Sequence, residues 1–114
     1  MKKTNYSFRN YQKDSRKTAG YPPIGHPIIY PVLGLSGEAG EISEKIKKIF
    51  RDKKGEITQE DKEMLTLELG DVLWYLTQIA SELDVNLEEV AEKNIKKLYS
   101  RMERGKLGGS GDKR

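Results

Sequence analysis

Apolar residues recur along the chain at the spacing of α-helices. From Val32 onward the apolar positions advance in alternating steps of three and four residues, which places them on one face of a helix. This first stripe consists of Val32, Leu35, Ala39, Ile42, Ile46 and Ile49. We therefore expect a helix from residue 32 to about residue 52.

A second stripe of the same kind predicts a longer helix. It consists of Leu65, Leu69, Val72, Leu76, Ile79 and Leu83. Thr58 precedes it with Asp61 three residues later, a pair typical of a capping box at a helix start, with Asp in place of the usual Glu. We expect this helix to extend over about 26 residues, after a polar turn at residues 53–56.

A third stripe predicts the last helix, and the chain before the first stripe is less regular. Asn86 and Glu89 repeat the capping pattern before an apolar series that predicts a helix to about residue 104. That series is Leu87, Val90, Ala91, Ile95, Leu98 and Met102. Near the N-terminus, Tyr6, Phe8 and Tyr11 predict a short helix ending near residue 17. Residues 20–31 contain four prolines, so we expect a connector there.

These patterns predict a single all-α domain. No segment alternates with a period of two, and short loops make successive helices antiparallel neighbours. We expect residues 1–114 to form one compact bundle of four to five helices, with an N-terminal segment and connector at 1–30. The glycine-rich tail at 105–114 is either a flexible end or a flap that phosphate orders.

Composition adds an expectation about assembly and compartment. Only 35% of the 114 residues are hydrophobic and 34% are charged, so the core of one chain is thin and we expect a homodimer or homotetramer. The absence of cysteine and the presence of one histidine, His26, exclude thiolate and two-histidine metal sites. The chain lacks a spanning apolar segment and a signal-peptide pattern, so we expect a cytoplasmic protein without membrane attachment.

The net charge of +3 is unevenly distributed. Residues 1–17 and 101–114 are basic, whereas the segment between them carries 15 acidic and 10 basic side chains. No basic helix with interleaved aromatic residues is present, so binding of nucleic acid is an unlikely function. An adaptor that binds nucleic acid through its basic ends stays open as an alternative.

The feature that points to chemistry is a motif that occurs twice, 30 residues apart. Residues 35–42 and 65–72 both read Leu, hydroxyl, any residue, Glu, apolar, Gly, carboxylate, β-branched. A helical wheel places each acidic pair on one shoulder of its helix, so antiparallel packing would bring four carboxylates together. These are Glu38, Glu41, Glu68 and Asp71.

Four converging carboxylates repel one another unless a cation lies among them. Oxygen ligands without histidine or cysteine favour Mg²⁺, with Mn²⁺ as a possible substitute. Gly40 and Gly70, each between the two acids of its motif, predict either close approach of the helices or room for a ligand with its hydrated metal. The alternative is that each acidic pair forms an ordinary solvated helix face.

These residues resemble the MazG-like all-α nucleoside triphosphate pyrophosphohydrolases. The family pattern of Glu-x-x-Glu on one helix and Glu-x-x-Asp on the next is similar to Glu38/Glu41 and Glu68/Asp71. The segment from Asn94 to Arg101 resembles the Asn-x-x-Lys element of the family's last core helix. The resemblance implies Mg²⁺ on the four carboxylates and hydrolysis of a nucleoside triphosphate, NTP or dNTP, to monophosphate and pyrophosphate.

Further roles follow for individual residues. One carboxylate must orient or deprotonate the attacking water; Glu41 is our first choice, with Glu38 beside it and Glu44 as a possible fifth acid. The resemblance places Tyr75 near the base, although a bare aromatic residue fits a core position equally well. The remaining candidates are cationic or polar groups that could meet phosphate or form solvated faces: Asn94, Lys97, Arg101, Lys48 and Arg51. A non-catalytic oligomerisation module that binds metal structurally is the main alternative function.

Overall fold

The structure, a computed structural model, describes residues 4–105 and is helical throughout its regular part. Its elements in chain order are α1 (Phe8–Arg16), α2 (Ile29–Lys53), α3 (Gln59–Glu82) and α4 (Leu87–Glu103). No strand occurs within the described residues, so the predicted all-α class is confirmed. All of the predicted tail at 105–114 except Gly105 lies outside the described residues.

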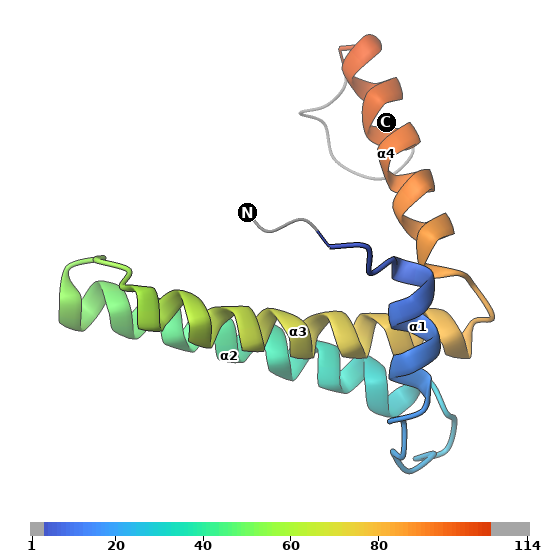
Figure 1. The fold of residues 1–114 in the computed structure, drawn as a ribbon, viewed down its shortest axis with the longest axis horizontal. Helices are drawn as coiled ribbons and strands as arrows, with labels where there is room; N and C mark the ends of the chain where they lie inside the picture. The colour runs from blue at the N-terminus through green and yellow to red at the C-terminus, as the bar shows by residue number, and fades with distance from the viewer. Residues whose placement is uncertain (1–3, 106–114) are drawn as a thin grey trace.

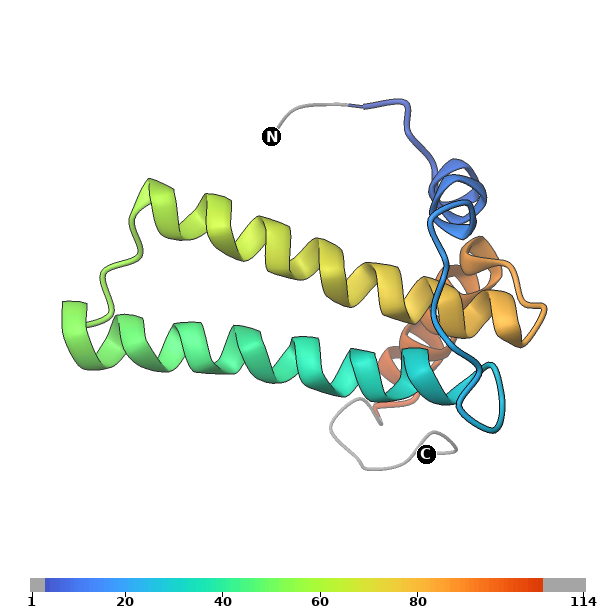
Figure 2. The ribbon, with the colours of Figure 1, turned by 90° about the horizontal axis from the view of Figure 1, so that it is seen from below.

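Helices α2 and α3 form a long antiparallel hairpin (Figures 1 and 2). Helix α2 begins three residues earlier than the apolar stripe indicates, and Pro31 lies in its first turn, where a missing N–H costs nothing. The His26 Nδ1 atom accepts a hydrogen bond from the Ile28 backbone N–H at 3.1 Å just before this start.

The tip of the hairpin is held by local polar contacts. Lys54 ends α2 in the left-handed conformation with φ of 56°, and Gly55 follows with φ of 79°. The expected capping box is present: the Asp61 N–H donates to Thr58 Oγ1 at 3.1 Å, and the Thr58 N–H donates to Asp61 Oδ2 at 3.0 Å. The Lys53 ammonium also donates to both oxygens of Asp61, at 2.9 and 2.8 Å. These contacts set the register of α2 against α3.

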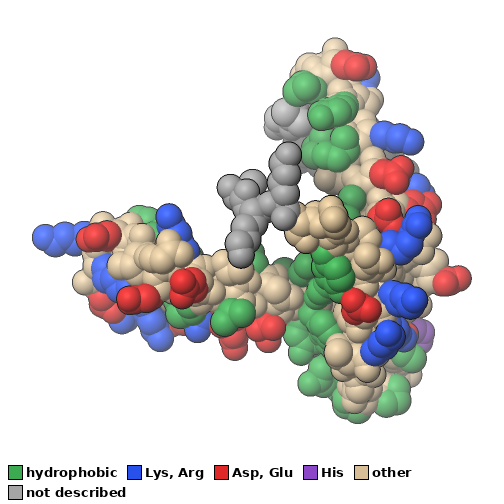
Figure 3. All heavy atoms as spheres, viewed as in Figure 1, with side chains coloured by type: hydrophobic (Ala, Val, Ile, Leu, Met, Phe, Trp, Pro, Cys, Tyr) green, Lys and Arg blue, Asp and Glu red, His purple; other side chains and the backbone are tan. Residues whose placement is uncertain are grey.

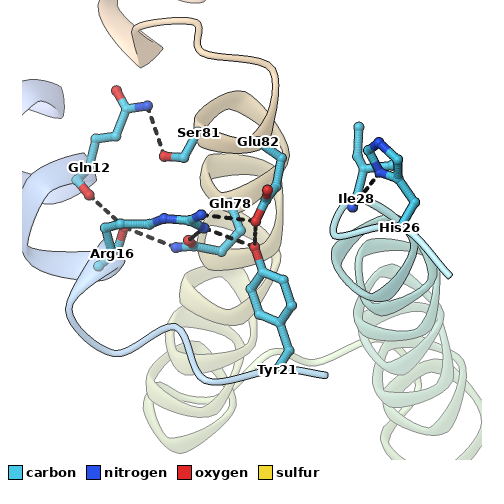
Figure 4. A network of polar contacts seen from close by, with 9 residues as sticks. Gln12, Arg16, Tyr21, His26, Ile28, Gln78, Ser81 and Glu82 are labelled. Atoms are coloured by element: carbon cyan, nitrogen blue, oxygen red, sulfur yellow. Dashed lines mark hydrogen bonds and ion pairs between the residues drawn. The ribbon is translucent and has the colours of Figure 1, made fainter. Parts of the chain in front are cut away.

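Helix α1 docks across the open end of the hairpin through a polar network (Figure 4). Gln78 of α3 is completely buried; its amide donates to Ser15 Oγ at 3.1 Å and accepts from Arg16 at 3.1 Å. Gln12 donates to the Val85 carbonyl at 2.9 Å and accepts from the Leu87 N–H at 2.8 Å. One helix therefore anchors both α3 and the turn that follows it.

Helix α4 departs from the antiparallel order that short loops predict. It packs against α1 and leaves the end of the hairpin at a steep angle (Figure 1). Asp84 takes a left-handed φ of 57° in the connecting turn, and Gln12 holds the backbone on either side of Asn86. The conformation of this turn and the two hydrogen bonds of Gln12 fix the direction of α4.

The resulting chain is open and has a small core. Its Cα radius of gyration is 17.0 Å, against about 13 Å for a compact domain of 100 residues. The buried apolar residues of the described chain are Pro31, Ile49, Ala80 and Leu87. Figure 3 shows hydrophobic side chains gathered on the side of α4 that faces the hairpin and at the corner between them.

None of the helices within residues 4–105 is both long enough and apolar enough to cross a membrane.

Candidate metal centre

Three carboxylates from the two hairpin helices come together midway along the hairpin. Glu38 and Glu41 lie one turn apart on α2, and Glu68 faces them from α3. One carboxylate oxygen from each residue lies within 4.8 Å of the other two. The structure therefore brings three of the four predicted ligands into a single cluster.

Asp71, the fourth predicted ligand, lies at the edge of this cluster. It is outside the group of converging oxygens, but its charge helps to raise the pKa of Glu38. Its side chain is exposed, whereas Glu38 and Glu68 are half-buried. Asp71 is therefore placed to approach the centre from the solvent side.

The cluster has the donor atoms that a hard divalent cation needs. The Oε2 atoms of Glu38 and Glu68 are buried and have no hydrogen-bond partner within the described part of the chain. Burial raises the pKa of the Glu38 carboxyl, and the negative charges of Glu41, Asp71 and Glu68 raise it further. Unpartnered buried carboxylate oxygens are costly unless a cation binds them, so this oxygen-only set fits Mg²⁺ or Mn²⁺.

One cation of the chain already contacts the cluster. The Lys45 ammonium lies 3.4 Å from Glu68 Oε1, the carboxylate oxygen other than the unpartnered Oε2 atom. Sequence reasoning assigned no role to Lys45. The available signal was its position four residues after Glu41, which places both side chains on the same face of α2.

Four aromatic rings lie beside the other end of the cluster. Tyr75 lies 6.4 Å from Tyr30 and 5.1 Å from Trp74 between ring centroids, and Tyr21 stacks on Tyr30 at 5.6 Å. Burial raises the pKa of the Tyr75 hydroxyl, as do the nearby charges of Tyr30 and Glu38. The ring predicted to lie near the substrate base is therefore next to the carboxylates.

Gly34 allows Tyr75 to occupy this position. A Cβ atom built on Gly34 would lie 2.2 Å from Tyr75 Cε1, so no other residue fits without displacing the ring. By contrast, a Cβ atom on Gly40 or Gly70 would meet nothing within 4 Å. Of the two alternatives predicted for Gly40 and Gly70, close helix approach does not occur within one chain, whereas the open space at both positions leaves room for a ligand. The glycine that does allow a close contact is Gly34, for which no role was predicted.

The other predicted site residues lie at different distances from the cluster. Lys48 lines a cavity of about 260 Å³ together with Lys45. Arg51 is bound to its neighbour Asp52 through two contacts of 2.7 and 2.8 Å on the exposed side of α2. The carboxylate of Glu44 is paired with Lys47 at 2.8 Å.

The candidates on α4 are separated from the carboxylates within one chain. Asn94 lines a cavity of about 360 Å³ with residues of α1 and α3. Lys97 and Arg101 follow it along the part of α4 that runs away from the hairpin (Figure 1). The structure therefore does not bring the whole predicted phosphate set together in one chain.

The fold and the cluster together define an all-α protein with a carboxylate centre suited to a divalent cation. Residues 31–105 match the family model of the MazG nucleotide pyrophosphohydrolase domain, and the chain belongs to this family.

The chain is also similar in sequence to two curated proteins. The chain is 50% identical over 109 residues to the Gene 37 protein of Mycobacterium phage L5, covering 91% of this chain and 96% of that protein. It is 34% identical over 67 residues to YpjD of Bacillus subtilis (strain 168), covering 59% of this chain and 60% of that protein. No solved structure matches the chain.

Proposed function

We propose that this protein hydrolyses a nucleoside triphosphate between its α and β phosphates in a Mg²⁺-dependent reaction. The observation that carries the proposal is the cluster of Glu38, Glu41 and Glu68, with two buried oxygens that have no partner among the described residues. This cluster lies within the segment that matches the pyrophosphohydrolase family.

Three carboxylates from the hairpin would hold the metal, and Asp71 would complete the set from the exposed side. A divalent cation bound there neutralises phosphate oxygens and lowers the pKa of a coordinated water. The protein's contribution is position: two rigid helices fix the carboxylates before the substrate arrives.

The reaction consumes one water for each triphosphate. The water oxygen forms a bond to phosphorus at the α–β bridge, the bridging P–O bond breaks, and its electron pair leaves with the departing phosphate group. The products are nucleoside monophosphate and pyrophosphate. Glu41 is the exposed member of the trio, so it is the group best placed to orient this water and accept its proton.

Tyr75 would lie against the nucleoside, and Lys48 would approach the phosphates. Arg51 would have to release Asp52 in order to join it. Asn94, Lys97 and Arg101 lie on α4, which diverges from the hairpin of its own chain. A homodimer or homotetramer would let another copy cover the exposed apolar side chains of this angle and bring α4 residues to the carboxylates. The proposal therefore includes assembly of the chain with copies of itself.

The test is pyrophosphate release from a panel of canonical and modified NTPs and dNTPs, with Mg²⁺, with Mn²⁺ and with EDTA. We expect monophosphate and pyrophosphate as products and no turnover in EDTA. Glu68→Gln removes a metal ligand and should abolish turnover, whereas Glu63→Gln removes an equal charge from the other side of α3 and should not.

Two outcomes would overturn the proposal. Normal turnover by Glu68→Gln would show that the cluster is not the active centre. Metal-dependent melting without hydrolysis of any nucleotide in the panel would instead indicate the non-catalytic metal-binding module.

A further inference from the structure

The side chains on one face of α2 change along the hairpin from a glycine beside an aromatic ring, through acidic residues, to basic residues. Positions 34, 38, 41, 45 and 48 follow the three- and four-residue spacing of a single helix face. They carry, in order, the glycine under the Tyr75 ring, two carboxylates of the cluster and two lysines. The carboxylate centre therefore lies between an aromatic end and a cationic end.

The cationic end contains a cavity. It has a volume of about 260 Å³ and lies between the C-terminal half of α2 and the N-terminal half of α3. Lys45 and Lys48 line it together with Ile49 and Met64. Because Lys45 also contacts Glu68 at 3.4 Å, the cavity begins where the carboxylate cluster ends.

Two aspartates also line this cavity, and each is paired with a basic side chain. Asp61 receives two hydrogen bonds from Lys53 and one from the Thr58 N–H. Asp52 lies beside Arg51, which holds both of its oxygens. These partners hold the pKa of each carboxyl below its ordinary value.

The charge available to a ligand in the cavity is therefore positive. Three lysines and two aspartates line the cavity. Lys48 makes no ion pair within 4.0 Å among residues 4–105, although its charge helps to lower the pKa of Asp52, and Lys45 lies 3.4 Å from Glu68. Two ammonium groups at the mouth of a small cavity match an anion that carries several charges.

We propose that this cavity binds the pyrophosphate portion of the substrate, with Lys45 and Lys48 as its ligands. The inference rests on the proposed function and gives the substrate a direction: nucleoside at Tyr75, scissile bridge at the carboxylates, β and γ phosphates beyond Lys45. Along α2, Lys45 lies about 6 Å and Lys48 about 10 Å beyond Glu41, at 1.5 Å of rise per residue.

Lys45 has a second effect in this arrangement. Its ammonium lies 3.4 Å from Glu68 Oε1, whereas Oε2 of the same carboxylate is buried and has no hydrogen-bond partner among the described residues. The carboxylate therefore holds Lys45 at the mouth of the cavity before any phosphate arrives, which reduces the cost of ordering a long side chain on binding.

The test measures binding of inorganic pyrophosphate and, separately, of nucleoside monophosphate by titration calorimetry in Mg²⁺. We expect K45M and K48M each to weaken pyrophosphate binding by about tenfold or more, the usual effect of losing one charge-assisted contact, and to leave monophosphate binding unchanged. The variant K45R keeps the charge and should retain most of the affinity.

The matched control is K47M. Lys47 lies between the two proposed ligands in sequence, but it is exposed and paired with Glu44, so its loss should not change pyrophosphate binding. Circular dichroism melting of every variant checks that the helices form.

The outcomes separate this inference from the proposed function. Pyrophosphate binding that is absent from the wild type, unchanged in K45M and K48M, or equally weakened in K47M overturns the inference even if triphosphates are hydrolysed. Loss of binding in K45M and K48M but not in K47M, without hydrolysis of any nucleotide, supports the cavity and overturns the proposed function.

Discussion

At the scale of a single residue, Glu38 lowers the stability of the folded chain while it supplies a carboxylate to the candidate metal centre. Its carboxyl is half-buried beside Glu41 and Glu68, and one of its oxygens has no hydrogen-bond partner among the described residues. Burial is the main cause of its raised pKa, and the neighbouring acidic charges add to it. Without a cation, the ionised form of this residue destabilises the folded chain.

This raised pKa predicts a pH dependence for Glu38→Gln in metal-free buffer. A carboxyl whose pKa is higher in the folded state stabilises the fold at low pH, and that contribution is lost as pH rises through the folded-state pKa. We therefore expect Glu38→Gln to become progressively more stable than the wild type, in urea unfolding, as the pH rises above the ordinary pKa of glutamate. A stability difference that does not change with pH would contradict the assignment.

Gly34 supports a second prediction at the same scale. Gly34→Ala must push the Tyr75 ring away from the carboxylates, because the new Cβ atom would lie 2.2 Å from Tyr75 Cε1. Overpacking of this kind costs about 1–3 kcal/mol, which equals or exceeds the gain in helix propensity of about 1 kcal/mol.

Gly37 provides the matched control on the same helix. A Cβ atom there meets nothing within 4 Å, so Gly37→Ala should be neutral or stabilising. Thermal unfolding of both variants measures the contrast, and equal melting temperatures would show that the Tyr75 ring is not held against Gly34.

At the scale of the elements, the attachment of α1 is mainly polar. Gln78 is fully buried in α3 and joins Ser15 and Arg16 of α1 (Figure 4). Arg16 and Tyr21 also converge on Glu82, and their hydrogen bonds lower the pKa of that carboxyl. This one network therefore places α1, the connector and the start of α4.

Replacing the central amide tests this role. Gln78→Met keeps the length of the side chain but leaves Ser15 and Arg16 without their buried partner, at a cost of about 1–3 kcal/mol. Hydrogen exchange should show loss of protection in α1 while the α2–α3 hairpin stays protected. The exposed Gln59→Met serves as the control, and unchanged exchange of α1 in Gln78→Met would contradict the prediction.

At the scale of the whole molecule, the core is small because α4 diverges from the hairpin and leaves apolar side chains exposed. Large apolar side chains stay exposed on α3 and α4, including Leu69 at 58%, Ile95 at 46% and Met102 at 60%. Burial of such surface is the dominant favourable term in folding and association. A single chain therefore gains only part of the free energy that burial of its apolar surface could provide.

We accordingly predict that stability depends on protein concentration. Sedimentation should detect a dimer or tetramer at micromolar concentration, and the melting temperature should rise with concentration. Val90→Glu, at the cavity between α3 and α4, should shift the protein towards monomer and lower its melting temperature. A monomer whose melting temperature is independent of concentration would refute this.

The sequence by itself determined the helices, the capping box of Thr58 and Asp61, and the two acidic motifs. These features depend on neighbours three or four residues apart, so the periodicity of Val32 to Ile49 and the Thr58/Asp61 pair suffice to predict them. The capping pattern at Asn86 correctly marks the start of α4, but the predicted cap is absent because the Asn86 side chain makes no cap hydrogen bond. The antiparallel hairpin follows from a short polar turn, and it is enough to bring Glu38, Glu41 and Glu68 together.

Only the tertiary structure decided which residues touch across helices. The contact of Lys45 with Glu68, the Tyr75 ring over Gly34 and the direction of α4 all depend on helix register and on a turn clamped by Gln12. Helical periodicity places a side chain on a face but does not specify which atom of the neighbouring helix it meets. For that reason Gly40 and Gly34 could be distinguished only in three dimensions.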